Sequence, residues 1–317
     1  MTSDQLNQRL DCYLSLERAL GLPMRAQERM LRSYVSFVVD KGVPCDLSAQ
    51  LALDWALAAS IRCGQSGHAA RLNVVRRFLS HLSATFPEAE IPPKGLLAQP
   101  PRPKPFLFGA SQIQELLKAA FNLGPEGSLR PHTVSTMFGL LASTGLRPSE
   151  ALKLTIADVD LQQQFSQLHI RETKFHKSRM VPLHGTTAAR LGDYAETRRR
   201  LAYDGLTDAF FVSEQGGPVQ YMALYRVFHR LLDSLQFKPL PGCRAPSLNS
   251  FRHGFAVERL RTWCQQGIDV QVWLPRLSVY LGHIDPIDTY WYLTATPDLL
   301  LEASNSFASY FQTGGTR

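Results

Sequence analysis

Several patterns that would place this 317-residue chain in a familiar class are scarce in its sequence. The cysteines are five in number and scattered, with no CxxC spacing: Cys12, Cys45, Cys63, Cys243 and Cys264. An odd, dispersed set of this kind does not predict a zinc site or a disulfide framework, and it fits a reducing compartment. The chain also has no internal repeat and no low-complexity tract.

Long apolar runs are missing too. No stretch approaches the roughly 18 apolar residues that a membrane-spanning helix needs. The first residues, MTSDQLNQRLDCY, are polar and include acids, which is unlike a secretory signal. We therefore expect a soluble, cytoplasmic protein. Apolar residues still make up 44% of the chain, so it can bury one large core or two ordinary ones.

The charge balance is basic. The chain has 34 Lys and Arg against 27 Asp and Glu, a net charge of +7, with a sequence pI of about 9.3. This excess suits a polyanionic partner such as nucleic acid. A generically basic protein would have the same balance, so charge alone does not separate the two readings.

A proline-rich segment divides the chain. Residues 91–106, IPPKGLLAQPPRPKPF, contain six prolines and the cations Lys94, Arg102 and Lys104. Proline lacks a backbone donor and disfavours helix in the residue before it, so an extended linker is expected here. The linker is either a basic strap along a DNA backbone or a solvated tether. We therefore expect a helical domain over 1–90, a second domain over 107–296, and a tail over 297–317.

Helical spacing dominates both domains. Residues 25–42 place Met30, Tyr34, Phe37 and Val38 on one face, and residues 67–82 form a second amphipathic helix. The polar face of this second helix is either simply solvated or a grip on DNA phosphates, and its arginines are Arg71, Arg76 and Arg77.

After the linker, Ser111 is the expected N-cap of another helix. The exception to the helical pattern is residues 167–183, where apolar and polar residues alternate around a cationic tip. This pattern predicts a β-hairpin, and its tip could enter a DNA groove, although exposed tips are commonly charged. The cationic tip residues are Lys174, His176, Lys177 and Arg179.

Four motifs carry the side chains with chemical potential. In TGLRPSEALKL (144–154), Arg147 opens a helix and needs an anionic partner, either Glu150 or a phosphate. The hairpin segment TKFHKSRMVPL (173–183) follows. NSFRHGFA (249–256) places Arg252 at another helix start, and LGHIDPIDTYWYL (281–293) ends the series. Each motif alone fits a packed structural role.

Together these motifs resemble the tyrosine recombinase, or phage-type integrase, family. Their order, their intervals and the nine-residue step from His283 to Tyr292 agree with the family's arginine, lysine, arginine and histidine-to-tyrosine boxes. The resemblance covers roughly residues 107–296. The preceding helical part resembles the family's core-binding domain only in type, and the DTYWYL run is similar to integrases of bacterial mobile elements.

The resemblance implies a role for each matching residue. Arg147 and Arg252 would clamp the scissile phosphate, and Lys174 would protonate the leaving 5′ oxygen. His283 would hydrogen-bond the phosphate. Tyr292 would be the nucleophile, because Tyr290 lies two residues away and faces elsewhere on a helix. The expected DNA contacts outside this set are Arg71, Arg76, Arg77, Lys104, Lys177 and Arg179.

One position departs from the family's pattern. The family usually has histidine or lysine three residues before the second arginine, and this chain has Asn249. Asparagine can donate a hydrogen bond to phosphate but cannot take up a proton. How the tyrosine is deprotonated is therefore open. His253 follows Arg252 on another side of the helix, and we expect it to be structural.

The family implies cleavage and rejoining of double-stranded DNA through a 3′-phosphotyrosine, with no metal or nucleotide cofactor. The expected architecture is mainly α with a small β-hairpin or sheet. Its two domains would form a C-shaped DNA clamp that works as a homo-tetramer, alone or with other recombinases. The alternatives are a non-catalytic DNA-binding partner of another recombinase, which Asn249 permits, and a type IB topoisomerase-like relaxase.

The tail has its own pattern. Thr296, Pro297 and Asp298 read as the start of a helix whose apolar face extends to Phe311. This face would dock either on its own catalytic domain or on a neighbouring protomer.

Overall fold

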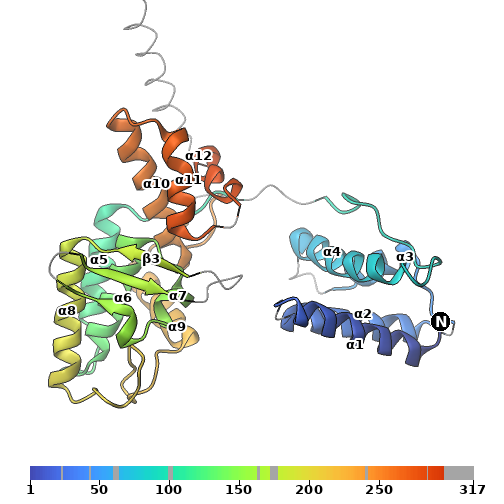
Figure 1. Ribbon diagram of the computed structural model, residues 1–317, viewed down its shortest axis with the longest axis horizontal. Helices are drawn as coiled ribbons and strands as arrows, with labels where there is room; N and C mark the ends of the chain where they lie inside the picture. Colours follow the sequence, from blue (N-terminus) through green and yellow to red (C-terminus); the bar gives the residue numbers. More distant parts are fainter. Residues whose placement is uncertain are drawn as a thin grey trace, which may run out of the picture. The chain divides into compact units, whose positions relative to one another are not determined.

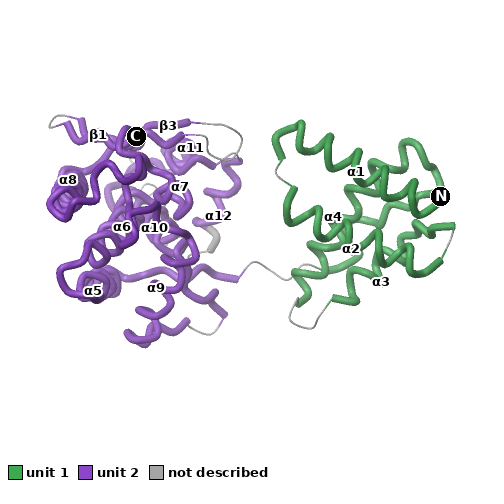
Figure 2. Tube along the Cα trace, turned by 90° about the horizontal axis from the view of Figure 1, so that it is seen from below, with its two compact units in different colours: residues 1–102 green, residues 103–317 purple. Residues whose placement is uncertain are grey.

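The chain divides into two compact units, residues 1–102 and 103–317 (Figures 1 and 2). The computed structural model describes residues 1–22, 24–42, 44–59, 64–98, 103–162, 165–171, 178–239, 242–283 and 285–295, with side chains up to 293. The division falls inside the predicted linker. No helix in these described ranges is long and apolar enough to span a membrane. The predicted tail, 297–317, lies outside the described residues.

Unit 1 is helical. Its elements are α1 (Ser3–Ala19), α2 (Arg25–Asp40), α3 (Ala49–Leu57) and α4 (Gly64–Leu82). In α2, Tyr34 and Val38 are buried as the helical spacing predicts, while Met30 and Phe37 are partly buried at the edge of the core. Tyr34 meets Trp55 of α3 edge to face, with ring centroids 5.5 Å apart. The predicted face of α4 is buried as well, through Leu72, Val75, Leu79 and Leu82.

Unit 2 is built around one helix that other helices cover on several sides. α6 (Arg130–Thr144) packs against α5 (Ala110–Phe121), α8 (Gly185–Arg200) and α10 (Asn249–Gln265). Being covered on several sides, α6 buries apolar residues around most of its circumference, as its MFGLLAS run requires. The remaining helices are α7 (Pro148–Leu152), α9 (Tyr221–Ser234), α11 (Val270–Leu281) and α12 (Ile287–Ala295). Figure 1 shows α10, α11 and α12 gathered at one end of the unit.

The helix after the linker starts earlier than predicted. Ser111 is not its N-cap, because α5 begins at Ala110 and Gly109 caps it. The Gly109 N–H donates to the side-chain oxygen of Gln112 at 3.0 Å. The glutamine three residues on therefore closes this helix end, and a serine side chain is not needed there.

The predicted hairpin is present and belongs to a three-stranded antiparallel sheet. β2 (Gln167–Ile170) pairs with β3 (Arg179–Pro182), with Ile170 opposite Arg179, and β1 (Val159–Asp160) pairs with β2 on its other side. Leu168, Ile170 and Val181 are buried, as the alternation predicts. The tip, 172–177, lies outside the described residues. The fold class is thus mainly α with a small sheet.

An aromatic cluster fixes the start of α10. Phe251 stacks on Phe108 at 5.1 Å between ring centroids, and it also meets Phe138 of α6 at 5.5 Å and Phe228 of α9 at 5.9 Å. Three elements therefore hold the residue next to Arg252. Each aromatic pair contributes specific geometry besides its buried area.

Replacing this anchor should destabilise unit 2. We expect Phe251→Ala to lower the free energy of unfolding by about 3–5 kcal/mol, the usual cost of removing a buried phenylalanine. Phe121→Ala is the matched control, because Phe121 is 47% exposed, and it should cost under about 1 kcal/mol. Urea unfolding followed by tryptophan fluorescence measures both. Equal losses in the two variants would show that the cluster is not an anchor.

Candidate active site

The first motif forms a tight turn between α6 and α7. Gly145 ends α6 with a φ of +63°, and a Cβ at this position would lie 2.6 Å from Cδ1 of Phe255. Only glycine satisfies both the left-handed backbone and the close contact. The chain then reaches Arg147, the N-cap of α7, with Pro148 in the first turn. Arg147 therefore stands at a helix start, as predicted.

Glu150 joins two arginines. It accepts a hydrogen bond from Nη1 of Arg147 at 2.8 Å, and Arg179 donates to both of its carboxylate oxygens, at 3.1 and 2.8 Å. Burial alone would raise the pKa of Glu150, but hydrogen bonds and charge from Arg179 and Arg147 hold that pKa below its ordinary value. The side chain of Arg147 is still 31% exposed. The pair with Glu150 thus leaves room for a phosphate.

Arg252 links the first motif to the last. It is 4% exposed, and its Nη1 and Nη2 donate to the carbonyl oxygens of Gly145 at 2.9 Å and Leu281 at 2.8 Å. Burial, and then the nearby charge of Arg147, lower the pKa of its guanidinium to about 10. The group is charged at neutral pH in spite of its burial.

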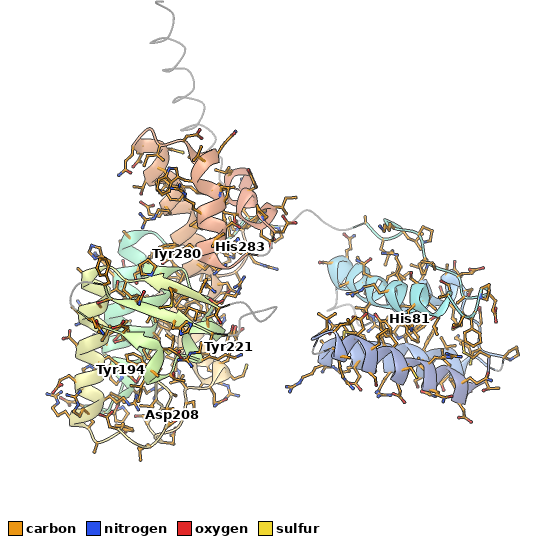
Figure 3. The ribbon with its side chains drawn as sticks, in the orientation of Figure 1. His81, Tyr194, Asp208, Tyr221, Tyr280 and His283 are labelled. Atoms are coloured by element: carbon orange, nitrogen blue, oxygen red, sulfur yellow. The ribbon has the colours of Figure 1, made fainter. Side chains whose placement is uncertain are left out.

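The last motif continues this network. Nη2 of Arg147 donates to the carbonyl oxygen of Gly282 at 2.9 Å, and Nε of Arg179 donates to that of Tyr280 at 2.8 Å. Figure 3 shows Tyr280 and His283 close together where α11 ends. Three guanidinium groups and one carboxylate therefore meet here, an excess of two positive charges that suits a phosphodiester.

His283 has its imidazole held in orientation by Thr289 of α12. Its Nδ1 lies 2.7 Å from the Oγ1 of the fully buried Thr289, and its backbone N–H donates to Ser278. Burial, followed by the charges of Arg252 and Arg147, lowers the pKa of His283 to about 3. In the DNA-free protein this imidazole is neutral at physiological pH, and a neutral ring can still donate one hydrogen bond.

Tyr292 lies beside this cluster on α12 and is 2% exposed. Its ring stacks on that of His283, with centroids 6.3 Å apart and an interplanar angle of 20°. Tyr290 is 43% exposed. The two tyrosines thus face different surroundings, and the structure brings Tyr292, Arg147, Arg252 and His283 into one site.

His253 is the residue whose position the sequence did not indicate. We expected a structural residue on another side of α10, but its Nδ1 lies 3.0 Å from the Oη of Tyr292. Helical spacing separates His253 from Arg252 by about 100°, yet α12 packs along α10 and meets this second side. Only the packing of the two helices reveals the contact.

The other predicted catalytic residues, Asn249 and Lys174, are not part of this hydrogen-bonded cluster as the structure describes it. Asn249 is the first residue of α10, one turn before Arg252, and it is exposed. Its side chain makes no hydrogen bond within the described part of the chain. Lys174 and Lys177 lie outside the described residues. No cluster of three or more His, Cys, Asp or Glu side chains that could hold a metal occurs in the ranges that the structure covers.

The predicted DNA contacts of unit 1 already have partners within that unit. Arg71 stacks over Trp55 at 3.7 Å and donates to its carbonyl oxygen. Arg76 donates to the carbonyl oxygens of Pro92 and Pro93, at 2.7 and 2.8 Å, and so ties the first half of the predicted linker to α4. The side chain of Arg77 is 64% exposed, with its guanidinium 3.6 Å from Glu17. Their DNA contacts remain predictions.

The two predicted contacts in unit 2 differ from each other. Lys104 is exposed, and its carbonyl oxygen accepts from the Arg244 N–H at 2.8 Å. Arg179 was expected on the hairpin tip. It is instead the first residue of β3, with a 12% exposed side chain paired to Glu150. This geometry favours a role in holding the site together over a direct contact with DNA.

Comparison with known proteins identifies the family of this chain. The profile of the Phage integrase family matches residues 108–298. "Putative integrase/recombinase y4rB" of Sinorhizobium fredii is 38% identical over 92% of this chain and 93% of its own length. "Putative integrase/recombinase y4rE" of the same organism is 33% identical over 94% of both chains.

The fold has solved counterparts. The XerH site-specific recombinase bound to palindromic difH substrate, in a post-cleavage complex, aligns over 96% of this chain and 84% of that chain. The TM-score is 0.68 at 16% identity. The chain belongs to the phage integrase family, the tyrosine-type site-specific DNA recombinases that break and rejoin DNA.

The lowered pKa of His283 predicts how stability depends on pH. The folded protein keeps this imidazole neutral down to about pH 3, whereas the unfolded chain protonates it near pH 6.5. The stability that this group contributes is complete above pH 6.5 and falls as the pH drops toward 3. The slope is at most about 1.4 kcal/mol per pH unit.

His283→Gln should remove this dependence. We expect the unfolding free energy of the wild type, measured relative to the variant, to decrease between pH 6.5 and 4. Urea titrations of both proteins across this range measure it. A constant difference would show that His283 titrates normally.

Arg179→Lys separates the two roles considered for Arg179. Lysine keeps the charge that a DNA phosphate needs but loses the planar fork that holds Glu150. We expect the variant to lose about 2 kcal/mol or more of stability, the value of a hydrogen bond to a charged group, and to bind DNA as before. Urea unfolding and fluorescence anisotropy with a labelled duplex measure these two quantities. If the variant is as stable as the wild type, Arg179 does not hold the site together, and a direct contact with DNA becomes the better account of its role.

Proposed function

We propose that the chain cleaves and rejoins DNA strands by attack of Tyr292 on a backbone phosphorus. Arg147 and Arg252 would bind the non-bridging oxygens, and His283, held by Thr289, would donate a third hydrogen bond. Lys174 would give a proton to the leaving 5′ oxygen. The product would be a 3′-phosphotyrosine that a 5′-hydroxyl of another strand can reverse. The proposed residues need no metal or nucleotide.

One observation carries this proposal. Side chains from distant motifs are tied together by backbone carbonyls, because Arg252 binds Gly145 and Leu281 while Arg147 binds Gly282. The guanidinium groups are thereby fixed before substrate arrives. Such prearrangement lets the donors meet the charge that develops in the transition state without reorganising.

The assembly belongs to the proposal as well. We infer that the two units clamp duplex DNA in a C shape, with residues 1–90 as the core-binding domain, 91–106 as linker and 107–296 as catalytic domain. Four protomers would act together, alone or beside a second recombinase, and the tail 297–317 would dock either on its own catalytic domain or on a neighbouring protomer. In support, one structural relative is a lambda integrase tetramer bound to a Holliday junction, at a TM-score of 0.60. The Sinorhizobium relatives are named as integrase/recombinases, and integration of a bacterial mobile element is the outcome we propose.

One observation favours a second function. Asn249, exposed at the start of α10, cannot carry a proton. A chain without a working proton acceptor would bind DNA beside a catalytic recombinase and leave the chemistry to that partner. A type IB topoisomerase-like relaxase would differ from both, since it would form an adduct and relax supercoils without exchanging strands.

The experiment uses DNA that the protein itself selects. Duplexes bound from a randomised library would be sequenced, resynthesised with a nick beside each candidate cleavage position, and incubated with the protein. Trapped covalent adducts are then counted on denaturing gels, and strand exchange and relaxation are scored on plasmids. Binding without any adduct supports the non-catalytic partner. An adduct with relaxation alone supports the relaxase.

Tyr292→Phe should abolish the adduct and leave DNA binding within about threefold of the wild type, because binding depends on many phosphate contacts. Tyr290→Phe is the control and should form the adduct normally, since Tyr290 is exposed whereas Tyr292 is buried beside His283. Gel quantitation and anisotropy measure the two effects. An adduct that persists in Tyr292→Phe, but not in Tyr290→Phe, would move the nucleophile to Tyr290.

A further inference from the structure

The phenol of Tyr292 must lose its proton when it attacks phosphorus. A phenol ionises near pH 10, so a neutral-pH reaction needs a nearby acceptor. The position where the family usually supplies one is Asn249, which cannot act as one. Tyr292 is 2% exposed, and this burial limits access by water. The acceptor therefore has to be a side chain already beside the hydroxyl.

His253 meets this requirement. Its Nδ1 is 3.0 Å from the Oη of Tyr292, within hydrogen-bonding distance for proton transfer. The ring is tilted 55° against that of Tyr292, and Trp291 meets it edge to face, with centroids 5.7 Å apart. Two side chains of α12 thus hold the imidazole of α10 in place. His283, by contrast, has its Nδ1 on Thr289 and presents its ring face to Tyr292.

We propose that His253 is a further catalytic residue of this chain, the base that takes the proton from Tyr292 during cleavage. The inference rests on the proposed role of Tyr292 as nucleophile. It assigns to His253 the function that Asn249 cannot perform, from a position one residue after Arg252 instead of three residues before it.

Cleavage by this route moves two protons. With its own proton on Nε2, the imidazole has a free electron pair on Nδ1. As the Oη–phosphorus bond forms, the phenol proton moves to Nδ1 and the bond from phosphorus to the 5′ oxygen breaks. That oxygen takes a proton from Lys174. Rejoining reverses each transfer, so His253 returns its proton to Tyr292.

The hydroxyl of Tyr292 lies close to a cluster of charged side chains. Arg252 precedes His253 on the same helix, and His283 stacks on the ring of Tyr292. Arg147, Arg179 and Arg252 all act on the charge of His283, and Glu150 acts on that of Arg252. Three cations against one carboxylate disfavour a further positive charge among these side chains, as the pKa of His283 shows, because burial and then the arginines lower it. A bound phosphodiester adds negative charge, which favours the protonated imidazole once transfer has occurred.

The same hydrogen bond has one other interpretation. His253 could hold Tyr292 in a buried, resting position that DNA binding must release. The two roles predict opposite effects of removing the imidazole. Loss of a base slows cleavage, typically by 10²–10⁴-fold, whereas loss of a restraint speeds it.

The test compares wild type with His253→Gln, which keeps a polar side chain that cannot take up a proton. Cleavage of the selected nicked duplex is timed from pH 5.5 to 9.5. We expect a decrease of about 10²-fold or more at pH 7 with unchanged DNA binding. The wild-type rate should level off once the imidazole is neutral, whereas the variant's rate should keep rising toward the pKa of a free phenol, about 10.

A second substrate separates the base from the acid. A 5′-bridging sulfur in place of oxygen leaves without being protonated, so it should rescue Lys174→Ala but leave His253→Gln slow. Asn249→His in the His253→Gln background should recover part of the rate by supplying a proton acceptor at the usual position. His184→Gln, at an exposed site, is the control for substitution and should cleave normally.

Each remaining outcome decides against the inference. If the wild type forms an adduct and His253→Gln matches it in rate and pH profile, His253 is only structural. Faster cleavage in His253→Gln identifies a restraint. Rescue of His253→Gln by the sulfur substrate would make His253 part of the acid pathway. If the wild type forms no adduct at all, the proposed function fails and the role of His253 fails with it. That result is distinguishable from the others, because in them the wild type forms the adduct.

Discussion

The site depends on a single buried guanidinium. Arg252 is almost inaccessible, and its hydrogen-bond partners in the described structure are two neutral carbonyl oxygens, of Gly145 and Leu281. A buried charge is expensive unless it is well satisfied, so this arrangement is stable only if both turns are in place. One side chain thereby fixes the positions of Arg147 and His283 relative to each other. The aromatic cluster around Phe251 holds Arg252 itself, and Glu150 keeps the neighbouring arginines from repelling each other unopposed.

Much of the architecture follows from sequence pattern. The amphipathic helices of unit 1 and the hairpin of unit 2 have strong periodicities, and the structure confirms both. Two features were missed because their signals are short or local. β1 has only two residues and no alternation to detect. The start of α5 depends on Gln112 closing the helix, so Ser111, which carries a typical capping side chain, gave the wrong boundary.

Part of the site could be predicted from the order and spacing of four motifs, which resemble those of a known family. The four motifs and their intervals indicated Arg147, Arg252, His283 and Tyr292, and the structure brings all four together. Contacts between helices have no such signal. The sequence placed Arg179 on a cationic tip, whereas the register of β3 turns it toward Glu150. The sequence also indicated a structural role for His253. Helical geometry shows that His253 and Arg252 lie on different sides of α10, but it does not show that α12 packs on the side of His253.

The carbonyl oxygens that the arginines bind have a further importance. Gly145 follows the last residue of α6, while Tyr280, Leu281 and Gly282 are at the end of α11. These are carbonyls that a helix cannot satisfy internally, and they are the negative ends of two helix dipoles. Arg147, Arg179 and Arg252 therefore act as caps for these helices. In many enzymes an active site is strained, and weakening it makes the protein more stable. Here two of the cations that cap the helices, Arg147 and Arg252, are also the ones proposed to bind the phosphate. For these two residues, stability and the proposed activity would favour the same side chain, so the site could be rigid without a trade-off between the two.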